Sequence, residues 1–242
     1  MNPMKSMVMG VTAAVLAFWS ATAQPNLDSV KARVRVLRQG DRKVYLLGTI
    51  HGDHARNPYY SWPHLERIVR AISPGLLCVE IRPEHFKPEE FYADGPIEMP
   101  FLVQLAQTLK IPCRPIDWWL DEWVWDMSKV DWDLRDDRMT ELLLKSLEES
   151  GTKTALVTVG NGHIDPFVLR LTKLGWFEDP APNLDLKIEH FSNVPDAVMD
   201  LWVNGIKYLS ALPAASTDRL ARKIETWKDI VKGKGYLFVR SN

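Results

Sequence analysis

The sequence predicts an α/β fold with a mostly parallel central sheet, flanking helices, an N-terminal hairpin and a helical tryptophan-rich insertion. One observation behind this is that short apolar runs, which suit buried strands, alternate along the chain with longer runs of helical period. A second observation is that three apolar runs, at 44–51, 76–80 and 154–163, each end in a titratable residue. Strand-helix-strand units favour right-handed crossovers, which make their strands parallel.

Length and composition fit one globular domain. The chain has 242 residues, of which 46% are hydrophobic and 25% charged, and this is enough for a substantial core without disulfides. The formal net charge of −1 gives no indication of nucleic-acid binding. We expect a single domain over residues 24–242.

Residues 1–23 have the pattern of a secretory signal peptide. Lys5 precedes an apolar run from Met7 to Trp19, and Ala21-Thr22-Ala23 fits a cleavage site. The apolar run is short for a membrane span. We therefore expect an exported protein, periplasmic or secreted, without a stable membrane span after cleavage.

The two cysteines are expected to be buried free thiols. Export would permit a disulfide between Cys78 and Cys113. However, Cys78 lies inside an apolar strand pattern and Cys113 lies at the start of the next one, where cysteine usually behaves as a small apolar residue.

The first half of the chain predicts a hairpin followed by a strand-helix-strand unit. Alternating residues favour strands at 31–37 and 43–47, with turn residues at 39–41. Ser61 can cap a helix that has Pro63 in its first turn. The remaining expected elements of this half are the strand at 76–80 and a helix at 99–110.

The second half predicts one edge strand and one central strand. The run at 111–116 contains two prolines, which places it at an edge, whereas the β-branched run at 154–159 suits a central position. The other expected elements are helices at 133–150, after His163 up to Gly175, and twice within 196–232, and strands at 184–191 and 236–239.

A segment rich in tryptophan and carboxylates follows the edge strand. Trp118, Trp125 and Trp132 recur every seven residues, so a continuous helix would place them on one face. Such a helix could simply dock through its aromatic stripe, or it could form an aromatic wall for a sugar, macrocycle or peptide substrate. We interpret the interleaved carboxylates as a solvated face.

The candidate functional residues stand at the ends of the three apolar runs. His51, Glu80 and His163 would converge if their strands are parallel, because open α/β sheets bind ligands outside the carboxyl edge. Each histidine could instead cap a strand end, but a buried Glu80 needs a cationic partner. Weaker candidates, which are expected to be solvated or capping residues, are Asp53, His54 and Asp165.

Four stretches resemble the TraB/GumN/Tiki family. They are Leu-Gly-Thr-Ile-His at 47–51, Val-Glu at 79–80, Arg-Asp-Asp-Arg-Met at 135–139 and Val-Gly-Asn-Gly-His at 159–163. The superfamily, which includes erythromycin-esterase-like hydrolases and ChaN-like haem-binding proteins, is marked by two Gly-x-x-His motifs with a Glu and an Arg between them. The resemblance spans residues 44 to about 170.

The resemblance implies His51, Glu80 and His163 as the functional core, with Arg135 or Arg138 as the cationic member. Two imidazoles and a carboxylate are plausible ligands for a divalent metal ion such as zinc, manganese or cobalt, which would activate water. The same groups can also work without metal, with a histidine as general base and an arginine at the oxyanion. Covalent catalysis is disfavoured, because no Gly-x-Ser-x-Gly motif occurs.

These residues predict an exported hydrolase that cleaves an ester or peptide bond of a small-molecule or peptide substrate by activated water. Two alternatives remain: a non-catalytic haem-binding or metal-binding protein of the same fold, and an interaction module that docks a partner through its tryptophan-rich segment.

Overall fold

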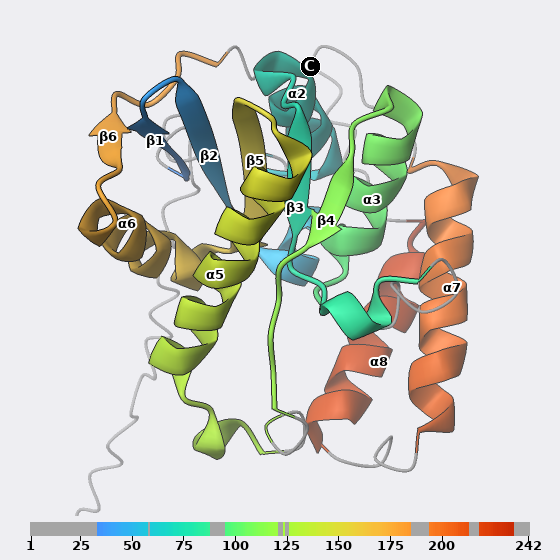
Figure 1. The fold of residues 1–242 in the computed structure, drawn as a ribbon. Helices are drawn as coiled ribbons and strands as arrows, with labels where there is room; N and C mark the ends of the chain where they lie inside the picture. The colour runs from blue at the N-terminus through green and yellow to red at the C-terminus, as the bar shows by residue number, and fades with distance from the viewer. Residues whose placement is uncertain are drawn as a thin grey trace, which may run out of the picture.

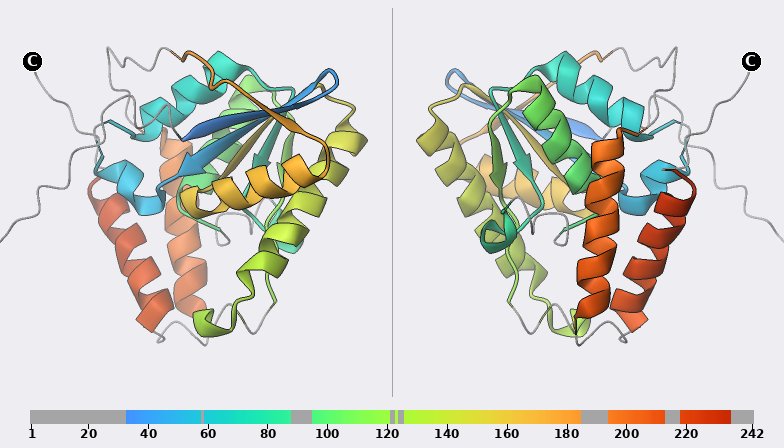
Figure 2. Two further views of the ribbon diagram at one scale, coloured as in Figure 1. Left: turned by 90° about the vertical axis from the view of Figure 1, so that its left-hand side faces the viewer. Right: turned by 90° about the vertical axis from the view of Figure 1, so that its right-hand side faces the viewer.

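A six-stranded β-sheet lies at the centre of the computed structural model, and helices cover both of its faces (Figures 1 and 2). The strands are β1 (Val34–Gln39), β2 (Arg42–Thr49), β3 (Leu76–Val79), β4 (Cys113–Pro115), β5 (Thr154–Gly160) and β6 (Phe177–Asp179). The helices are α2 (Trp62–Ile72), α3 (Glu98–Leu109), α5 (Trp132–Ser150), α6 (Ile164–Lys173), α7 (Asp196–Ala211) and α8 (Asp218–Lys232). The structure describes residues 33–57, 59–87, 95–120, 123, 126–184, 194–212 and 218–234.

The sheet is mixed, and its order is β4-β3-β5-β2-β1-β6. The pairs β4–β3, β3–β5 and β5–β2 are parallel, whereas β1 is antiparallel to both β2 and β6. The predicted parallel arrangement therefore holds for the half of the sheet that carries the candidate residues. The predicted hairpin forms the start of the other half. Strand β6 was not predicted, because three residues are too few to show a period.

The predicted positions of β5 and β4 within the sheet are confirmed. Strand β5 is central, between β3 and β2, and the proline-containing β4 is an edge strand. The hairpin of β1 and β2 turns at Gly40, whose φ of 60° lies in the left-handed region that glycine adopts without strain.

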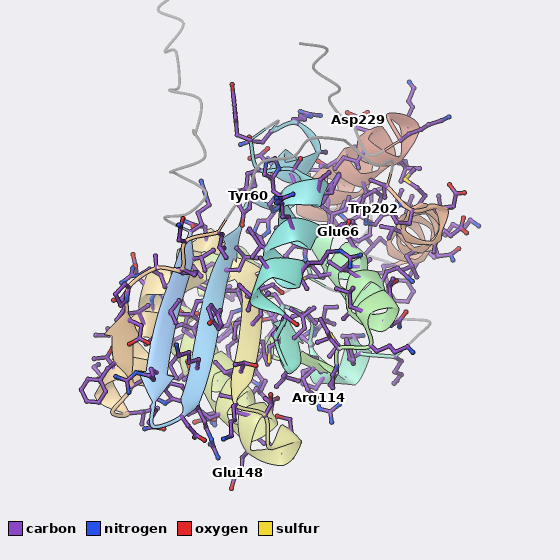
Figure 3. The ribbon with its side chains drawn as sticks, turned by 90° about the horizontal axis from the view of Figure 1, so that it is seen from above. Tyr60, Glu66, Arg114, Glu148, Trp202 and Asp229 are labelled. Carbon is purple, nitrogen blue, oxygen red and sulfur yellow. The ribbon has the colours of Figure 1, made fainter. Side chains whose placement is uncertain are left out.

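Two apolar cores lie on opposite faces of the sheet. Neighbouring residues of one strand, such as Leu46 and Leu47, belong to different cores because strand side chains alternate between faces. Helices α2, α3, α7 and α8 cover the first face, and α5 and α6 cover the second. Seen from above, Tyr60 and Trp202 lie on one side of the sheet and Glu148 on the other (Figure 3).

Both cysteines are free, as predicted. Cys78 belongs to the core under α5 and α6, whereas Cys113 packs against the core on the other face. Their side chains leave adjacent strands on opposite sides of the sheet, a geometry that a disulfide cannot bridge.

The tryptophan-rich segment does not form the predicted continuous helix. Trp118–Leu120 has no regular secondary structure, Met127–Lys129 is a 3-10 turn (η3), and Trp132 is already the first residue of α5. Local hydrogen bonds explain this: Asp117 accepts from the backbone N–H of Trp118 at 2.7 Å, and Asp131 caps α5 by accepting from Leu134. Trp125 lies outside the described residues.

Three predictions fall on residues outside the described ranges. These are the signal peptide at 1–23, most of the strand at 184–191 and the strand at 236–239. Among the described residues, none of the helices combines the length and apolar character that crossing a membrane requires.

Candidate functional site

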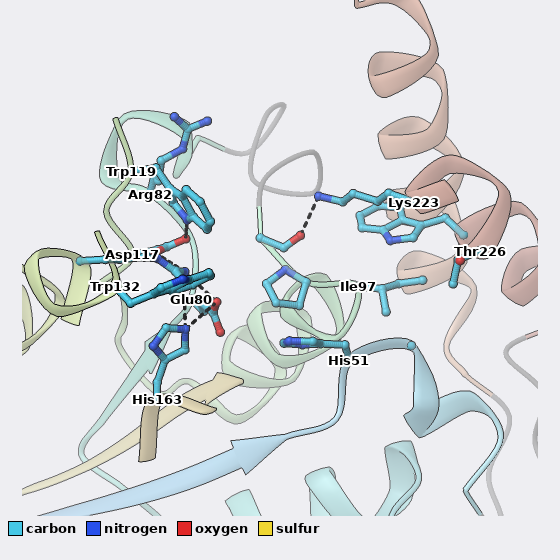
Figure 4. Close-up of a pocket in the computed structure, with 15 residues that line it drawn as sticks. His51, Glu80, Arg82, Ile97, Asp117, Trp119, Trp132, His163, Lys223 and Thr226 are labelled. Carbon is cyan, nitrogen blue, oxygen red and sulfur yellow. Dashed lines mark hydrogen bonds and ion pairs between the residues drawn. The ribbon is translucent and has the colours of Figure 1, made fainter. Parts of the chain in front are cut away.

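Three neighbouring parallel strands deliver His51, Glu80 and His163 to one edge of the sheet. His51 follows β2 in a 3-10 turn (η1, His51–Ala55), Glu80 follows β3, and His163 ends the 3-10 turn (η4, Asn161–His163) that follows β5. All three line one cavity of about 410 Å³ (Figure 4). The parallel register brings together groups that are far apart in the sequence, as the sequence analysis predicted.

The two Gly-x-x-His motifs pack against each other through their glycines. A Cβ on Gly160 would lie 2.8 Å from Cε1 and 2.9 Å from Nε2 of His51, and 3.6 Å from Oε2 of Glu80. A Cβ on Gly48 would lie 2.5 Å from Oδ1 of Asn161. Each glycine therefore leaves room for the other motif, and the His51 ring and the Glu80 carboxylate meet in the space above Gly160.

His51 is held by a buried carboxylate that the sequence analysis did not identify. Its Nδ1 lies 3.0 Å from Oε1 of Glu98, the first residue of α3, which has no exposed surface. The backbone of His51 is left-handed, with φ of 54°, a strained conformation that is found more often at functional sites. Because Nδ1 faces Glu98, Nε2 is the nitrogen directed at Gly160 and Glu80.

The charges around His51 change its protonation. Partial burial lowers the pKa of His51, but the negative charges of Glu98 and Glu80 outweigh this effect and raise it to about 9. Burial raises the pKa of Glu98, and the charge of His51 outweighs it, so that the carboxyl is ionised more readily than usual. Thr49 is close enough to contribute to this lowering, yet neither its hydroxyl nor Oε2 of Glu98 has a well-aligned partner among the described residues.

Glu80 and Arg135 form the centre of a buried ionic network. Nη2 of Arg135 donates to Oε1 of Glu80 at 2.8 Å, and Nε and Nη2 donate to Oδ1 of Asp117 at 3.0 and 2.6 Å. Oε2 of Glu80 accepts from the backbone N–H of Gly160 at 2.6 Å. Although burial raises the pKa of Glu80, the positive charge of Arg135 outweighs it, and the pKa is well below the usual range. Glu80 is therefore ionised at neutral pH and is a poor proton acceptor there.

His163 holds Arg135 in place. Its Nε2 accepts a hydrogen bond from Nη1 of Arg135 at 2.7 Å, and its Nδ1 donates to Oδ1 of Asp136. These partners assign the proton of the neutral ring to Nδ1 and occupy the lone pair of Nε2. His163 thus orients Arg135, and its Nε2 is already engaged by the guanidinium.

Aromatic rings surround the guanidinium of Arg135. Its Cζ lies 4.2 Å from the ring centre of Trp119 and 5.8 Å from that of Trp132. The indole N–H of Trp119 donates to Oδ2 of Asp117 at 2.8 Å. Part of the tryptophan-rich segment therefore forms one side of the site, although it is not a helix.

The remaining candidates lie outside this cluster. Arg138 is exposed and pairs with Glu141 at 2.7 Å, so Arg135 is the arginine of the site. His54 is fully buried, accepts from the N–H of Ile50 and faces the carbonyl of Tyr60, and burial lowers its pKa to about 4. It supports the turn that carries His51. Asp53 is exposed, and the side chain of Asp165 is exposed and pairs with Arg35.

The residues do not form a fitting metal site. No group of three or more His, Cys, Asp or Glu side chains in the described part of the chain is arranged to hold a metal ion. In addition, Nε2 of His163 already accepts from Arg135, so a cation could bind there only if the guanidinium moved away.

Sequence reasoning missed Glu98, Asp117 and Asp136. Asp117 follows an apolar strand as Glu80 does, and this signal could have identified it, but the interpretation of its segment as a solvated face was wrong at this position because Asp117 is buried. Asp136 lies beside Arg135 in a stretch that was already singled out. Glu98 gives no such signal, since a glutamate in the first turn of a helix is usually solvated.

Comparisons of the chain with protein-family models, with curated proteins and with solved structures found no match.

Proposed function

We propose that the protein is a hydrolase that cleaves an ester or amide bond with a water molecule activated by His51. The observation that carries the proposal is the pair of His51 and Glu98 at the edge of the cavity. A buried carboxylate on Nδ1 fixes the tautomer and orientation of the ring, and it leaves Nε2 to accept a proton from water.

Arg135 is suited to stabilise the oxyanion. Its hydrogen bonds to Glu80, Asp117 and His163 fix the guanidinium, and they leave one proton of Nη1 without a partner among the described residues. A fixed cation at the wall of a cavity stabilises negative charge that develops on a carbonyl oxygen without having to reorganise. Glu80 and His163 position this cation, and Glu80 also stabilises protonated His51.

Water is the nucleophile in this proposal. Thr226 supplies the one hydroxyl side chain among the described residues that line the cavity, and its methyl group faces Gly52. Burial raises the pKa of Cys78, and also that of Cys113 to about 12; neither lines the cavity. The proposal follows the metal-free route because Arg135 occupies the lone pair of His163.

Hydrolysis of a panel of model esters and amides by the purified protein tests the proposal. Replacing His51 by asparagine should lower kcat/KM by about 10²–10⁴-fold, because the general base is lost. The matched control is Asp53→Asn in the same exposed turn, which should keep its activity. Dialysis against a chelator should have no effect. Activity that survives His51→Asn would contradict the general base, and activity lost on chelation would favour a metal.

Gly160→Ala should lower activity more than stability. The new Cβ displaces the His51 ring, whose side chain is 53% exposed and can move, so the free energy of unfolding should change by less than about 1 kcal/mol. A displacement of the base by about 1 Å can cost about 10²-fold in rate. Gly162→Ala is the matched control, because a Cβ there meets nothing within 4 Å. The rate of hydrolysis and the denaturation curve are measured for both variants. Equal rates of hydrolysis would contradict this placement of His51.

Membership of the TraB/GumN/Tiki family is part of the proposal. His51, Glu80, Arg135 and His163, the positions that carry the resemblance, lie within one hydrogen-bonded and packed cluster. This clustering supports a shared hydrolytic site.

A further inference from the structure

The indole of Trp132 is an exposed aromatic surface inside the cavity. Its residue is 45% exposed although it begins a helix that packs on the core. The other large apolar residues with high exposure in the described ranges lie elsewhere, and none of them lines the cavity. Figure 4 shows Trp132 projecting into the cavity from the side of α5. An apolar ring held open to water at a cavity wall gains free energy when a ligand covers it.

The opposite wall of the cavity is also apolar in part. Ile97 lies on this wall beside Lys223 and Thr226 of α8 (Figure 4). Trp227 of the same helix also lines the cavity. Lys223 lies 5.4 Å from the ring centre of Trp227 and donates to the carbonyl of Gly95 at 3.0 Å. The cavity thus lies between an aromatic wall, formed by Trp132 of α5, and a partly apolar wall, formed by Ile97 and residues of α8. His51, Glu80 and Arg135 lie at its base.

Most charges of the lining are paired. Four cationic or protonated side chains line the cavity, namely His51, Arg82, Arg135 and Lys223. Its two carboxylates, Glu80 and Asp117, both accept hydrogen bonds from Arg135. Behind the lining, Glu98 lies 3.0 Å from His51 and Glu84 pairs with Arg82 at 3.6 Å, so the positive charges around the cavity are matched by carboxylates.

We infer that the cavity binds small substrates with a planar apolar ring, and that this ring stacks on Trp132. This inference deepens the proposed function and rests on it, since the ring belongs to the part of the ester or amide that does not react. The volume of about 410 Å³ suits a small molecule. Stacking on Trp132 orients the ring within the cavity.

Binding of ketones, which have a carbonyl but no bond to hydrolyse, tests the inference separately from catalysis. Isothermal titration calorimetry on the full chain would compare 4-acetylphenylacetate (an anionic ring ligand), 4-methylacetophenone (a neutral ring ligand) and the ring-free anion 5-oxohexanoate. We expect both ring ligands to bind at least about tenfold more tightly than 5-oxohexanoate.

Substitutions at Trp132 identify the ring responsible. Trp132→Ala should weaken binding of the ring ligands about tenfold, and Trp132→Phe should retain most of the affinity because it keeps a ring. Phe177→Ala, which removes an exposed aromatic ring outside the cavity, is the control and should change nothing.

Two results would overturn the inference: undetectable binding of both ring ligands, or binding of the ring-free anion that is as tight as that of 4-acetylphenylacetate. These comparisons use the unmodified protein, so they decide the matter even if Trp132→Ala fails to fold. Ring binding without any hydrolysis would refute the proposed function alone, and hydrolysis without ring preference would refute this inference alone.

Discussion

Replacing Arg135 by methionine is expected to lower the free energy of unfolding by about 3–5 kcal/mol at neutral pH. The guanidinium is almost fully buried and donates to both Glu80 and Asp117, so its removal takes away a cation that two buried carboxylates share. Denaturant titration measures the change. Since these carboxylates can become neutral by protonation, the loss should be smaller at acid pH than at neutral pH.

Arg138→Met is the matched control in the same helix. The side chain of Arg138 is 49% exposed, and its one ion-pair partner among the described residues is the exposed Glu141, so its replacement should change the free energy of unfolding by less than about 0.5 kcal/mol. Similar effects of the two substitutions would contradict the assignment of Arg135 as the buried cation of the site.

The rate of hydrolysis is expected to rise with pH up to about 9. In the proposed mechanism His51 has to be deprotonated to accept a proton from water. Because its pKa is raised to about 9, kcat/KM should increase about tenfold per pH unit below that value and then level off. A pH profile of kcat/KM for the best model ester measures this. A plateau that begins near pH 6.5, the ordinary value for histidine, would show that Glu98 and Glu80 do not act on the base as described.

Glu98→Gln provides the second arm of this test. Removing the negative charge next to Nδ1 of His51 should shift the rising limb of the pH profile about 1–3 units towards acid pH.

The negative charge of Glu98 also makes the stability of the protein depend on pH. Because the pKa of His51 is higher in the folded than in the unfolded protein, its contribution to stability is complete below about pH 6.5 and is lost as the pH rises through about 9. In Glu98→Gln this pH dependence should diminish.

Local patterns predicted the elements that hold the site. An apolar run before each Gly-x-x-His motif predicted β2 and β5, helical periods predicted α2, α3, α5 and α6, and the pattern at 196–232 predicted α7 and α8. These predictions succeeded because strand and helix periods and their start and stop residues are local properties of the chain. The prediction of a continuous helix from Trp118 to Trp132 failed because Asp117 binds the backbone and the indole that follow it.

The sequence by itself determined that His51, Glu80 and His163 end parallel strands, and parallel strands share a carboxyl edge. Only the tertiary structure decided what each residue does there. It placed Arg135 rather than Arg138 in the network, and it brought Glu98 from another helix onto His51. The physical reason is that the charge and hydrogen bonding of a buried group depend on neighbours across the fold, which periodicity along the chain does not specify.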